Sequence, residues 1–315
     1  MSLQRYLIKR VLVTIPVLLG VSLLTFSLVE LLPGNVVDYV LQFQDSTPEL
    51  RAQLEAQYNL DEPIYVRYWL WLKGAAVFDF GESVISGRSV SAAIAGALPN
   101  TLALGFFGFF IAIGIGIPLG IVSAVKNGET ADEVSRVAAL LGIATPNFWL
   151  GLMLLFVFSV KLELFRVIPP DKPLFSLAMM KFSVLPAITL GTASAALIMR
   201  LTRSSMVEEL SKDYVRTARA KGLSERTVIL KHVLRNSMIS VVTVAALQIA
   251  FLVDGAVVVE QVFSWPGLGR MLINAIIQRD FPIIQAIVML IATTIVLANL
   301  LADLTYAWLD PRIRY

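Results

Sequence analysis

Residues 213–237 read DYVRTARAKGLSERTVILKHVLRNS, a long polar and basic stretch inside a chain that is otherwise strongly apolar. Of the 315 residues, 57% are hydrophobic and 16% are charged, whereas a soluble protein carries about 25% charged residues. The surrounding sequence therefore indicates an all-α, polytopic membrane protein, and the polar stretch is expected to lie outside the lipid.

The polar stretch shows helical spacing on both sides of a glycine. Apolar and small side chains recur every three or four residues between positions 206 and 221, which predicts one helix over that range. Gly222 ends this helix, because glycine adopts a left-handed backbone without strain. Ser224 is then expected to cap a second helix, with Glu225 in its first turn.

Small and basic side chains in this module favour a docking surface for a cytoplasmic protein. Ala218, Ala220 and Gly222 would let the backbone of a partner come close. Positive charge surrounds them at Arg216, Arg219 and Lys221. The alternative is a basic loop that binds anionic lipid or follows the positive-inside rule. That alternative requires neither a central glycine nor two capped helices.

Six apolar segments are long enough to cross a bilayer, which takes about 20 residues per helix. The first follows a basic segment and has no small-x-small cleavage site after it, so we interpret it as a retained anchor. The distribution of Lys and Arg places both termini and the polar stretch in the cytoplasm. The expected spans cover residues 10–31, 100–125, 137–160, 183–203, 237–259 and 282–308.

The segment between the first two spans is rich in acidic residues and is not membrane-like. Thr47 and Pro48 predict the start of one short helix, and Asp61-Glu62-Pro63 the start of another that carries Tyr and Trp side chains suited to the bilayer interface. We expect an anchor helix at 1–31, an extracytoplasmic helical domain at 32–99, and a five-helix core at 100–315 that carries the polar loop 204–236.

Several motifs are missing from the sequence. There is no cysteine and one histidine, His232, which disfavours a metal site and a catalytic triad. No GxxxxGK[ST] phosphate-binding loop is present. We therefore expect no catalytic residue, no metal and no cofactor in this chain.

A second group of candidate residues lies in and after the fifth span. Asp254 is an ionisable residue at membrane depth, which could line a translocation path or be a hydrogen-bonded structural acid. Glu260 is expected near the outer surface, beside the sequence SWPGLG, which contains Pro266 and Gly267. That sequence is either a re-entrant turn that acts as a gate or a plain tight loop.

Two features of the spans predict how they pack and bend. Gly116 and Gly120 form a small-xxx-small pair in the second span, which favours close helix packing. Pro118 and Pro146 are expected to kink the second and third spans.

The spacing around Gly222 resembles the EAA loop of ATP-binding-cassette (ABC) importer permeases, in which Glu-Ala-Ala, three residues, Gly, nine residues and Ile-x-Leu-Pro follow one another. The glutamate and the proline of that pattern are replaced by Arg216 and Arg235. The positions that agree are Ala218, Gly222 and Leu234.

The variant spelling YVRTARAKGLS, followed by KHVLRNS, resembles the dipeptide, oligopeptide and nickel branch of these permeases closely, in particular the first of its two paired permeases. Stretches over nearly the whole chain resemble the same branch: LLPGN, YNLDEP, FDFGES, LPNTLAL, ATPNFWLGLMLL, VVVEQVFSWPGLGRML and DPRIR.

The resemblance implies a type I ABC importer permease fold with six transmembrane helices, and an import function for di- or oligopeptides. The implied partners are a homologous second permease, two ATPase subunits that bind ATP and Mg, an extracytoplasmic binding protein and membrane lipid, without nucleic acid. Within the polar loop, the implied coupling-helix positions are Tyr214, Arg216, Thr217, Ala218, Arg219, Ala220, Gly222, Leu223, His232 and Leu234.

Two further interpretations stay open at this point. The same importer class also handles nickel chelates, glutathione and oligosaccharides. An ion-driven secondary transporter needs no docking loop, but it would require paired ionisable residues near the midplane, where Asp254 stands nearly alone.

Overall fold

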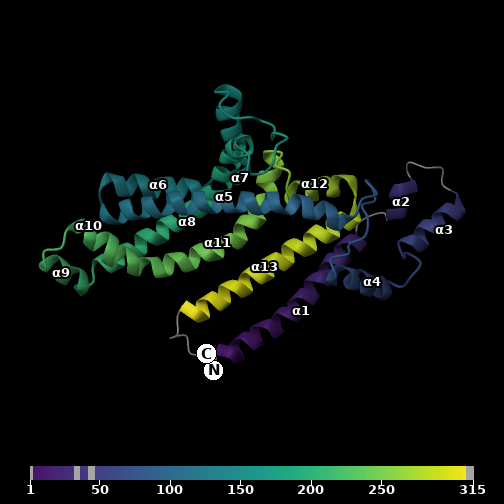
Figure 1. Ribbon diagram of the computed structural model, residues 1–315, viewed down its shortest axis with the longest axis horizontal. Helices are drawn as coiled ribbons and strands as arrows, with labels where there is room; N and C mark the ends of the chain where they lie inside the picture. The colour runs from purple at the N-terminus through teal and green to yellow at the C-terminus, as the bar shows by residue number, and fades with distance from the viewer. Residues whose placement is uncertain (1–2, 32–35, 42–46, 310–315) are drawn as a thin grey trace. The chain divides into compact units, whose positions relative to one another are not determined.

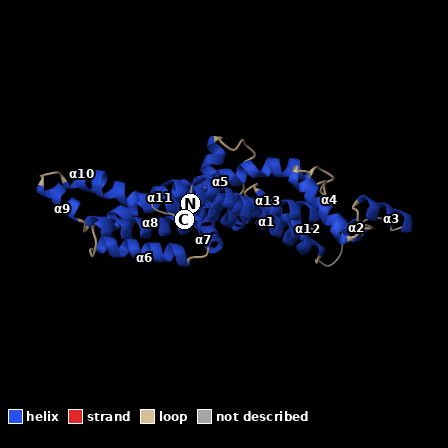
Figure 2. Cartoon of the chain, turned by 90° about the horizontal axis from the view of Figure 1, so that it is seen from below, coloured by secondary structure: helices blue, strands red, loops and turns tan. Residues whose placement is uncertain are grey.

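The computed structural model describes residues 3–31, 36–41 and 47–309. Within these ranges the chain is built from helices and the loops between them (Figure 2). The elements in chain order are α1 (Leu3–Glu30), α2 (Val36–Leu41), α3 (Pro48–Gln57), α4 (Ile64–Ala76), α5 (Val90–Val125), α6 (Thr130–Ala144), α7 (Asn147–Leu154), the π-helical turn η1 (Leu155–Lys161), α8 (Leu177–Leu210), α9 (Asp213–Ala220), α10 (Glu225–Thr227), the π-helical turn η2 (Val228–Val233), α11 (Leu234–Val262), α12 (Leu268–Gln278) and α13 (Phe281–Leu309).

Five helical segments among the described residues are long and apolar enough to cross a membrane. A sixth span is obtained when α6 and the continuous helix α7–η1 are counted together as one bent crossing. The predicted all-α, polytopic fold is confirmed on this count. The five unbroken segments are 12–30, 90–125, 177–210, 225–245 and 281–298.

The third predicted span, 137–160, is not one helix. The chain bends by 105° between α6 and α7–η1. Thr145 adopts an extended backbone (ψ 121°) and Pro146 precedes the first residue of α7. Proline offers no N–H to the helix and disfavours helical geometry in the residue before it. The kink predicted at Pro146 is therefore a complete break, whereas α5 continues as a helix through Pro118.

The chain divides into two compact units. Of the described residues, unit 1 comprises 3–31, 36–41, 47–100 and 266–301, and unit 2 comprises 101–265 and 302–309. Figure 1 shows the helices of each unit, coloured along the chain.

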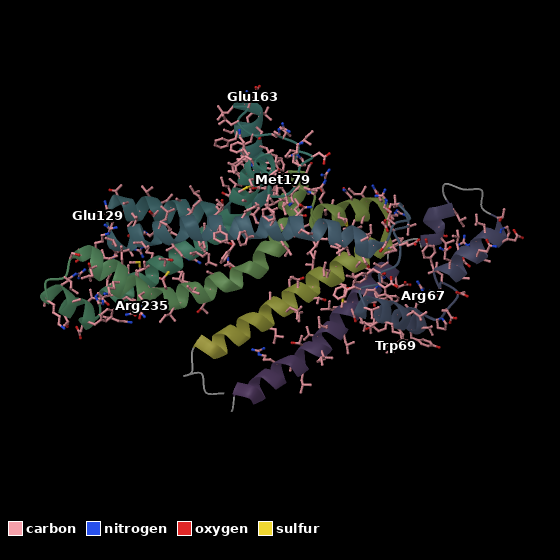
Figure 3. The ribbon with its side chains drawn as sticks, viewed as in Figure 1. Arg67, Trp69, Glu129, Glu163, Met179 and Arg235 are labelled. Carbon is pink, nitrogen blue, oxygen red and sulfur yellow. The ribbon has the colours of Figure 1, made fainter. Side chains whose placement is uncertain are left out.

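Unit 1 contains both short helices that the acidic segment predicts. Thr47 caps α3, and its hydroxyl accepts the N–H of Leu50 at 3.2 Å. The next helix, α4, packs on α1 through an ion pair between Arg67 and Glu30 at 2.6 Å. A hydrogen bond of 2.8 Å joins the hydroxyls of Ser22 and Tyr68. Arg67 and the exposed Trp69 both project from α4 (Figure 3).

The same unit is closed by the loop that precedes α5. Ser83 in this loop donates a hydrogen bond of 2.5 Å to Asp280, whose side chain is 2% exposed. The backbone N–H of Val84 reaches the other oxygen of that carboxylate at 3.3 Å. A buried carboxylate thus holds the loop against the start of α13, because both of its oxygens have donors.

Unit 2 is a helix bundle in which α8 is the central helix, packed by α6, α7 and α11. The predicted close packing at Gly116 and Gly120 is confirmed. A Cβ added to Gly116 would lie 2.6 Å from the carbonyl oxygen of Ala195, and one added to Gly120 would lie 2.5 Å from the Cβ of Thr202. Only glycine permits this approach of α5 to α8.

Candidate functional site: the helix-turn-helix module at 204–236

The polar stretch folds into a compact module after the end of α8. The single helix predicted for 206–221 is wrong, because α8 ends at Leu210 and α9 begins at Asp213. Lys212 has an extended backbone (ψ 150°) at the N-cap of α9. No proline or glycine marks this break. At this break, Lys212 and Tyr214 both contact the carboxylate of Glu209 near the end of α8.

Gly222 turns the chain in the way its sequence position predicts. Its backbone has φ +75°, in the left-handed region that favours glycine. Ser224 stands at the N-cap of α10, as predicted, but its hydroxyl bonds to the hydroxyl of Thr227 at 2.9 Å and not to a backbone N–H. Across the turn, the guanidinium of Arg219 donates to both oxygens of Glu225, at 2.6 and 3.1 Å.

One face of α9 packs into its own chain. Val215 is fully buried and Ala218 is 8% exposed. They form an apolar cluster with Ala124 at the end of α5 and Met206 on α8. The sequence analysis expected Ala218 to offer a small surface to another protein, but in this structure its side chain is buried against its own chain. Its small side chain instead lets α9 lie close to the bundle.

The opposite face of α9 and the turn are open to solvent. The exposed positions among the sequence candidates are Arg216, Thr217, Arg219, Ala220, Gly222 and Leu223. Tyr214, His232 and Leu234 are half-buried. Arg216 has 76% of its side chain exposed and reaches Asp213 at 3.4 Å, a contact that solvent weakens. The module thus presents an exposed basic face. We call the face formed by Arg216, Thr217, Arg219 and Ala220 the outer face of α9.

Glu209 anchors the start of α9, a role that no pattern in the sequence predicts. The hydroxyl of Tyr214 donates to one oxygen of Glu209 at 2.5 Å, and the ammonium of Lys212 pairs with the other. Burial, and then the bond to the Glu209 carboxylate, raise the pKa of the Tyr214 phenol. These bonds hold the break at 211–212 and the first turn of α9 against the end of α8.

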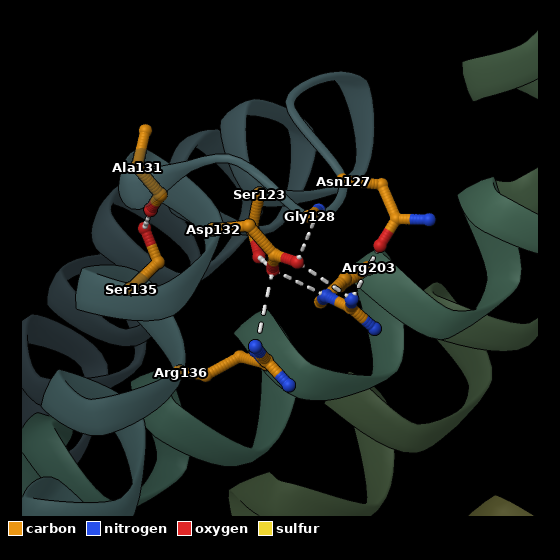
Figure 4. A network of polar contacts seen from close by, with 8 residues as sticks. All are labelled: Ser123, Asn127, Gly128, Ala131, Asp132, Ser135, Arg136 and Arg203. Atoms are coloured by element: carbon orange, nitrogen blue, oxygen red, sulfur yellow. Dashed lines mark hydrogen bonds and ion pairs between the residues drawn. The ribbon is translucent and has the colours of Figure 1, made fainter.

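A second polar cluster in unit 2 also escaped prediction (Figure 4). Asp132, in the first turn of α6, is 1% exposed. Arg203 of α8 donates to both of its oxygens, at 2.6 and 2.8 Å. The two residues are 71 positions apart. A single sequence offers no signal for such a pairing, beyond the presence of an acid and a base near expected helix ends.

The candidate residues in and after the fifth span belong to different parts of the chain. Asp254 belongs to α11, but its side chain is outside the described residues. The side chain of Glu260 is fully buried in unit 2 and accepts a hydrogen bond from the hydroxyl of Thr101 at 2.7 Å. Pro266 and Gly267 belong to unit 1, where Gly267 is the N-cap of α12.

The described residues hold no group of three or more acidic, histidine or cysteine side chains arranged to bind a metal. The module itself presents exposed guanidinium groups, a small exposed turn and a preformed helix.

Comparison with known proteins identifies the class to which this geometry belongs. A family model described as "Binding-protein-dependent transport system inner membrane component" matches residues 116–315. A model for the N-terminal region of such membrane components matches residues 3–105. The chain belongs to this family of transport-system membrane components.

Curated relatives of this permease cover nearly its full length. The oligopeptide transport system permease protein AppB of Bacillus subtilis (strain 168) is 40% identical over 316 residues, which is 98% of this chain and 99% of the relative. The dipeptide transport system permease protein DppB of Alkalihalophilus pseudofirmus is 40% identical over 331 residues, with the same shares. The glutathione transport system permease protein GsiC of Salmonella choleraesuis is 43% identical over 314 residues, again with these shares.

Solved structures agree on the fold. A structure of inward-facing conformations of the MetNI methionine ABC transporter has a TM-score of 0.57 and 16% identity, and covers 69% of this permease and 96% of the matched chain. An amino acid ABC transporter with histidines has a TM-score of 0.54 and 13% identity, with coverages of 69% and 94%. The predicted family and the predicted type I importer permease fold are confirmed. Membership implies ATPase and substrate-binding partners in general.

Proposed function

We propose that this permease is the membrane-spanning subunit of an ABC importer for di- and oligopeptides, and that its module at 204–236 docks on separate ATPase subunits. The single observation that carries the docking role is the two-faced α9. Val215 and Ala218 are packed inside the chain, while Arg216, Thr217 and Leu223 are exposed. A helix that is packed on one side and exposed on the other can transmit a displacement by a bound partner to the helix bundle.

The exposed charges of the module indicate what the partner surface looks like. Arg216, Arg219, Lys221 and Arg226 are all exposed around the glycine turn. Asp213 and Glu225 offset part of this charge, and Glu225 is already paired with Arg219. The outer face of α9 therefore suits a groove on the ATPase that carries carboxylates.

The remaining parts of the importer are proposed on the same grounds, together with family membership. The module faces the cytoplasm together with both chain termini, and the acidic segment 32–99 faces the binding protein outside. ATP and Mg bind to the ATPase subunits, and a homologous second permease completes the membrane part. This chain itself has no catalytic role.

Substrate class rests on the relatives. The oligopeptide, dipeptide and glutathione permeases are 40%, 40% and 43% identical over nearly the whole chain. Glutathione is itself a short peptide. The feature common to the three is a short chain of amide-linked amino acids, which is the substrate class we propose.

Co-purification tests the docking role. The chain is expressed with its partner subunits, captured by a tag, and the co-purifying ATPase is quantified. Arg216→Glu changes an exposed side chain on the outer face of α9, and Leu223→Asp changes one in the turn that follows. Both should reduce the recovered ATPase, because each puts a negative charge at the contact with a groove that carries carboxylates. Tagged chain recovered in the same yield shows that the variants still fold.

Lys126→Glu is the matched control. Lys126 is a basic residue with 53% of its side chain exposed, and it lies outside the module, between α5 and α6. The control should retain the ATPase. If Arg216→Glu and Leu223→Asp also retain it in full, or if the wild-type chain recovers no ATPase at all, the docking proposal is wrong.

A further inference from the structure

The carboxylate of Asp132 joins three segments of unit 2 in one cluster (Figure 4). The hydroxyl of Ser123 on α5 donates to one oxygen at 2.5 Å, and the backbone N–H of Gly128, in the turn, donates to the other at 3.0 Å. Arg203 on α8 donates to both oxygens. With four bonds on two oxygens, the carboxylate has its full complement of donors.

Arg203 and the turn reinforce this arrangement. The guanidinium also donates to the amide oxygen of Asn127 at 2.7 Å, so it is bound to the turn as well as to α6. Gly128, whose N–H donates to the carboxylate, has φ +83°, a backbone conformation that other residues rarely adopt. Arg136 makes a longer contact with Asp132, at 3.6 Å, from a side chain that is 53% exposed.

The cluster lies beside the packing of α9. Ser123 bonds to Asp132, and its neighbour Ala124 belongs to the apolar cluster of Val215 and Ala218. On α8, Arg203 is followed one turn later by Met206, which packs in the same apolar cluster. The helix that would receive force from an ATPase and the helix that carries Asp132 thus share the same short stretches of α5 and α8.

The two kinds of contact resist motion differently. Where Gly142 on α6 meets Ala196 on α8, the two helices touch through close van der Waals packing. Packed helices can slide past each other by about 1–2 Å. Charge-assisted hydrogen bonds are directional and weaken steeply when the donor angle opens. The bidentate bond between Arg203 and Asp132 therefore fixes the register of α6 against α8, which apolar packing alone does not.

We propose that Asp132 and Arg203 are positioning residues that keep α6 in register with α8, so that displacement of α9 by an ATPase is delivered to α6 and to the bent segment α7 after it. This inference rests on the proposed function. It assigns to the cluster the transmission of movement, and not docking, ATP hydrolysis or substrate binding.

The test uses the complete importer, with its ATPases and second permease, in liposomes. ATP hydrolysis and uptake are measured on the same preparation, and their ratio is the readout. The probes are labelled trialanine and labelled glutathione, and whichever the wild type takes up is used. Asp132→Asn keeps the size of the side chain and removes its charge. Arg203→Lys keeps the charge and removes the two-pronged bond.

Both variants should assemble and hydrolyse ATP within about twofold of wild type, while uptake per ATP falls about tenfold, since a lost charge-assisted hydrogen bond shifts an equilibrium by a factor of about ten or more. Arg136→Gln is the control and should leave the ratio within about twofold, because exposed ion pairs contribute little. A purely structural role would lower the amount of assembled complex and leave the ratio unchanged.

A disulfide staple separates register from stability. A Cβ added to Gly142 on α6 would lie 3.3 Å from the Cβ of Ala196 on α8, close to the Cβ separation of a disulfide, about 3.5–4.5 Å. The chain contains no cysteine, so Gly142→Cys with Ala196→Cys can form only this intramolecular bond. In the Asp132→Asn background, the oxidised staple should restore the ratio and a reducing agent should remove the effect. Asp132→Asn without the cysteines controls for the reducing agent.

The outcomes are distinct. An unchanged ratio in Asp132→Asn or Arg203→Lys, or a lowered ratio that the oxidised staple does not restore, overturns the assignment while the importer reading stands. A wild-type complex that hydrolyses no ATP, or that takes up neither probe, overturns the proposed function and this inference with it. A lowered ratio restored by oxidation supports both.

Discussion

Replacing Gly120 with alanine should destabilise the bundle, whereas the same change at Gly114, six residues earlier in the same helix, should not. A Cβ at Gly120 would lie 2.5 Å from the Cβ of Thr202 and 2.7 Å from the backbone oxygen of Met199. A Cβ at Gly114 would meet no atom within 4 Å. The two substitutions add the same methyl group to α5, so their difference isolates the contact with α8.

The expected magnitude follows from these distances. Non-bonded carbon atoms are most favourable at about 3.5–4.0 Å, so α5 and α8 would have to separate by roughly 1 Å at Gly120. Because one of the clashing atoms belongs to the backbone of Met199, no side-chain rotation relieves the contact. Overpacking of this kind costs about 1–3 kcal/mol in the free energy of unfolding. The gain of about 0.5–1 kcal/mol from replacing a helical glycine by alanine offsets part of this cost.

We therefore expect Gly120→Ala to be destabilised by about 1–2 kcal/mol and Gly114→Ala to be unchanged or stabilised by up to about 1 kcal/mol. The assay is the midpoint of thermal unfolding in detergent, followed by the fluorescence of the Trp residues at a fixed heating rate. For chains of 150–250 residues, 1 kcal/mol corresponds to about 2–4 °C. The two variants should differ by several degrees. Equal midpoints would show that the helices do not approach as closely as the structure has them, and would refute the packing argument.

Three further outcomes are expected. Trp265→Ala should cost about 3–5 kcal/mol in the free energy of unfolding, because the Trp265 ring is fully buried and stacks on Phe182 with 5.9 Å between ring centroids. Thermal unfolding measures this cost, and a change below about 1 kcal/mol would contradict the prediction. Ser83→Ala should cost about 1–3 kcal/mol in the free energy of unfolding, since it removes a hydrogen-bond donor from the buried carboxylate of Asp280. Hydrogen exchange in the loop before α5 should then accelerate, and an unchanged exchange rate would show that the bond does not form. Because folding raises the pKa of Tyr214, its phenol stabilises the fold fully below the ordinary phenol pKa of about 10, and this stabilisation is lost as the pH rises through the raised pKa. The ultraviolet difference titration of wild type minus Tyr214→Phe should therefore have its midpoint above pH 10.

Sequence patterns were sufficient for the membrane architecture and for local turns. Long apolar segments have few alternative structures in a membrane protein, because each backbone group in lipid must be bonded within a helix. The positive φ of Gly222 and the cap at Thr47 follow equally from residue chemistry over a few neighbouring positions. These features depend on local preferences, which a single sequence contains.

Features that depend on tertiary contacts were not predictable. The sequence places a proline at 146, but the 105° bend there is a property of the folded bundle, in which α7 packs on α8 and α11. The break at 211–212 has no glycine or proline, and it is held by the bonds of Glu209 with Lys212 and Tyr214. Which side of α9 is buried also depends on the position of α5, and that position cannot be read from periodicity alone.

The short length of α9 bears on how the docking surface that we propose can exist before a partner binds. The helix has eight residues, and isolated helices shorter than about 12–15 residues are marginal in water. Tertiary contacts must therefore supply its stability. Burial of Val215, worth about 1.5–3 kcal/mol for a fully buried aliphatic side chain, and the bond from Tyr214 to Glu209 are the contacts that do so.

A docking helix stabilised in this way differs from one that folds on contact. A partner that binds the outer face of α9 does not have to order the helix, so little binding free energy is spent on conformational entropy. The contacts that stabilise α9 are also its connections to α5 and α8, through Ala124 and Met206. Weakening those contacts should therefore reduce the affinity for the partner and the transmission of movement together, whereas changes at Arg216 should affect affinity alone.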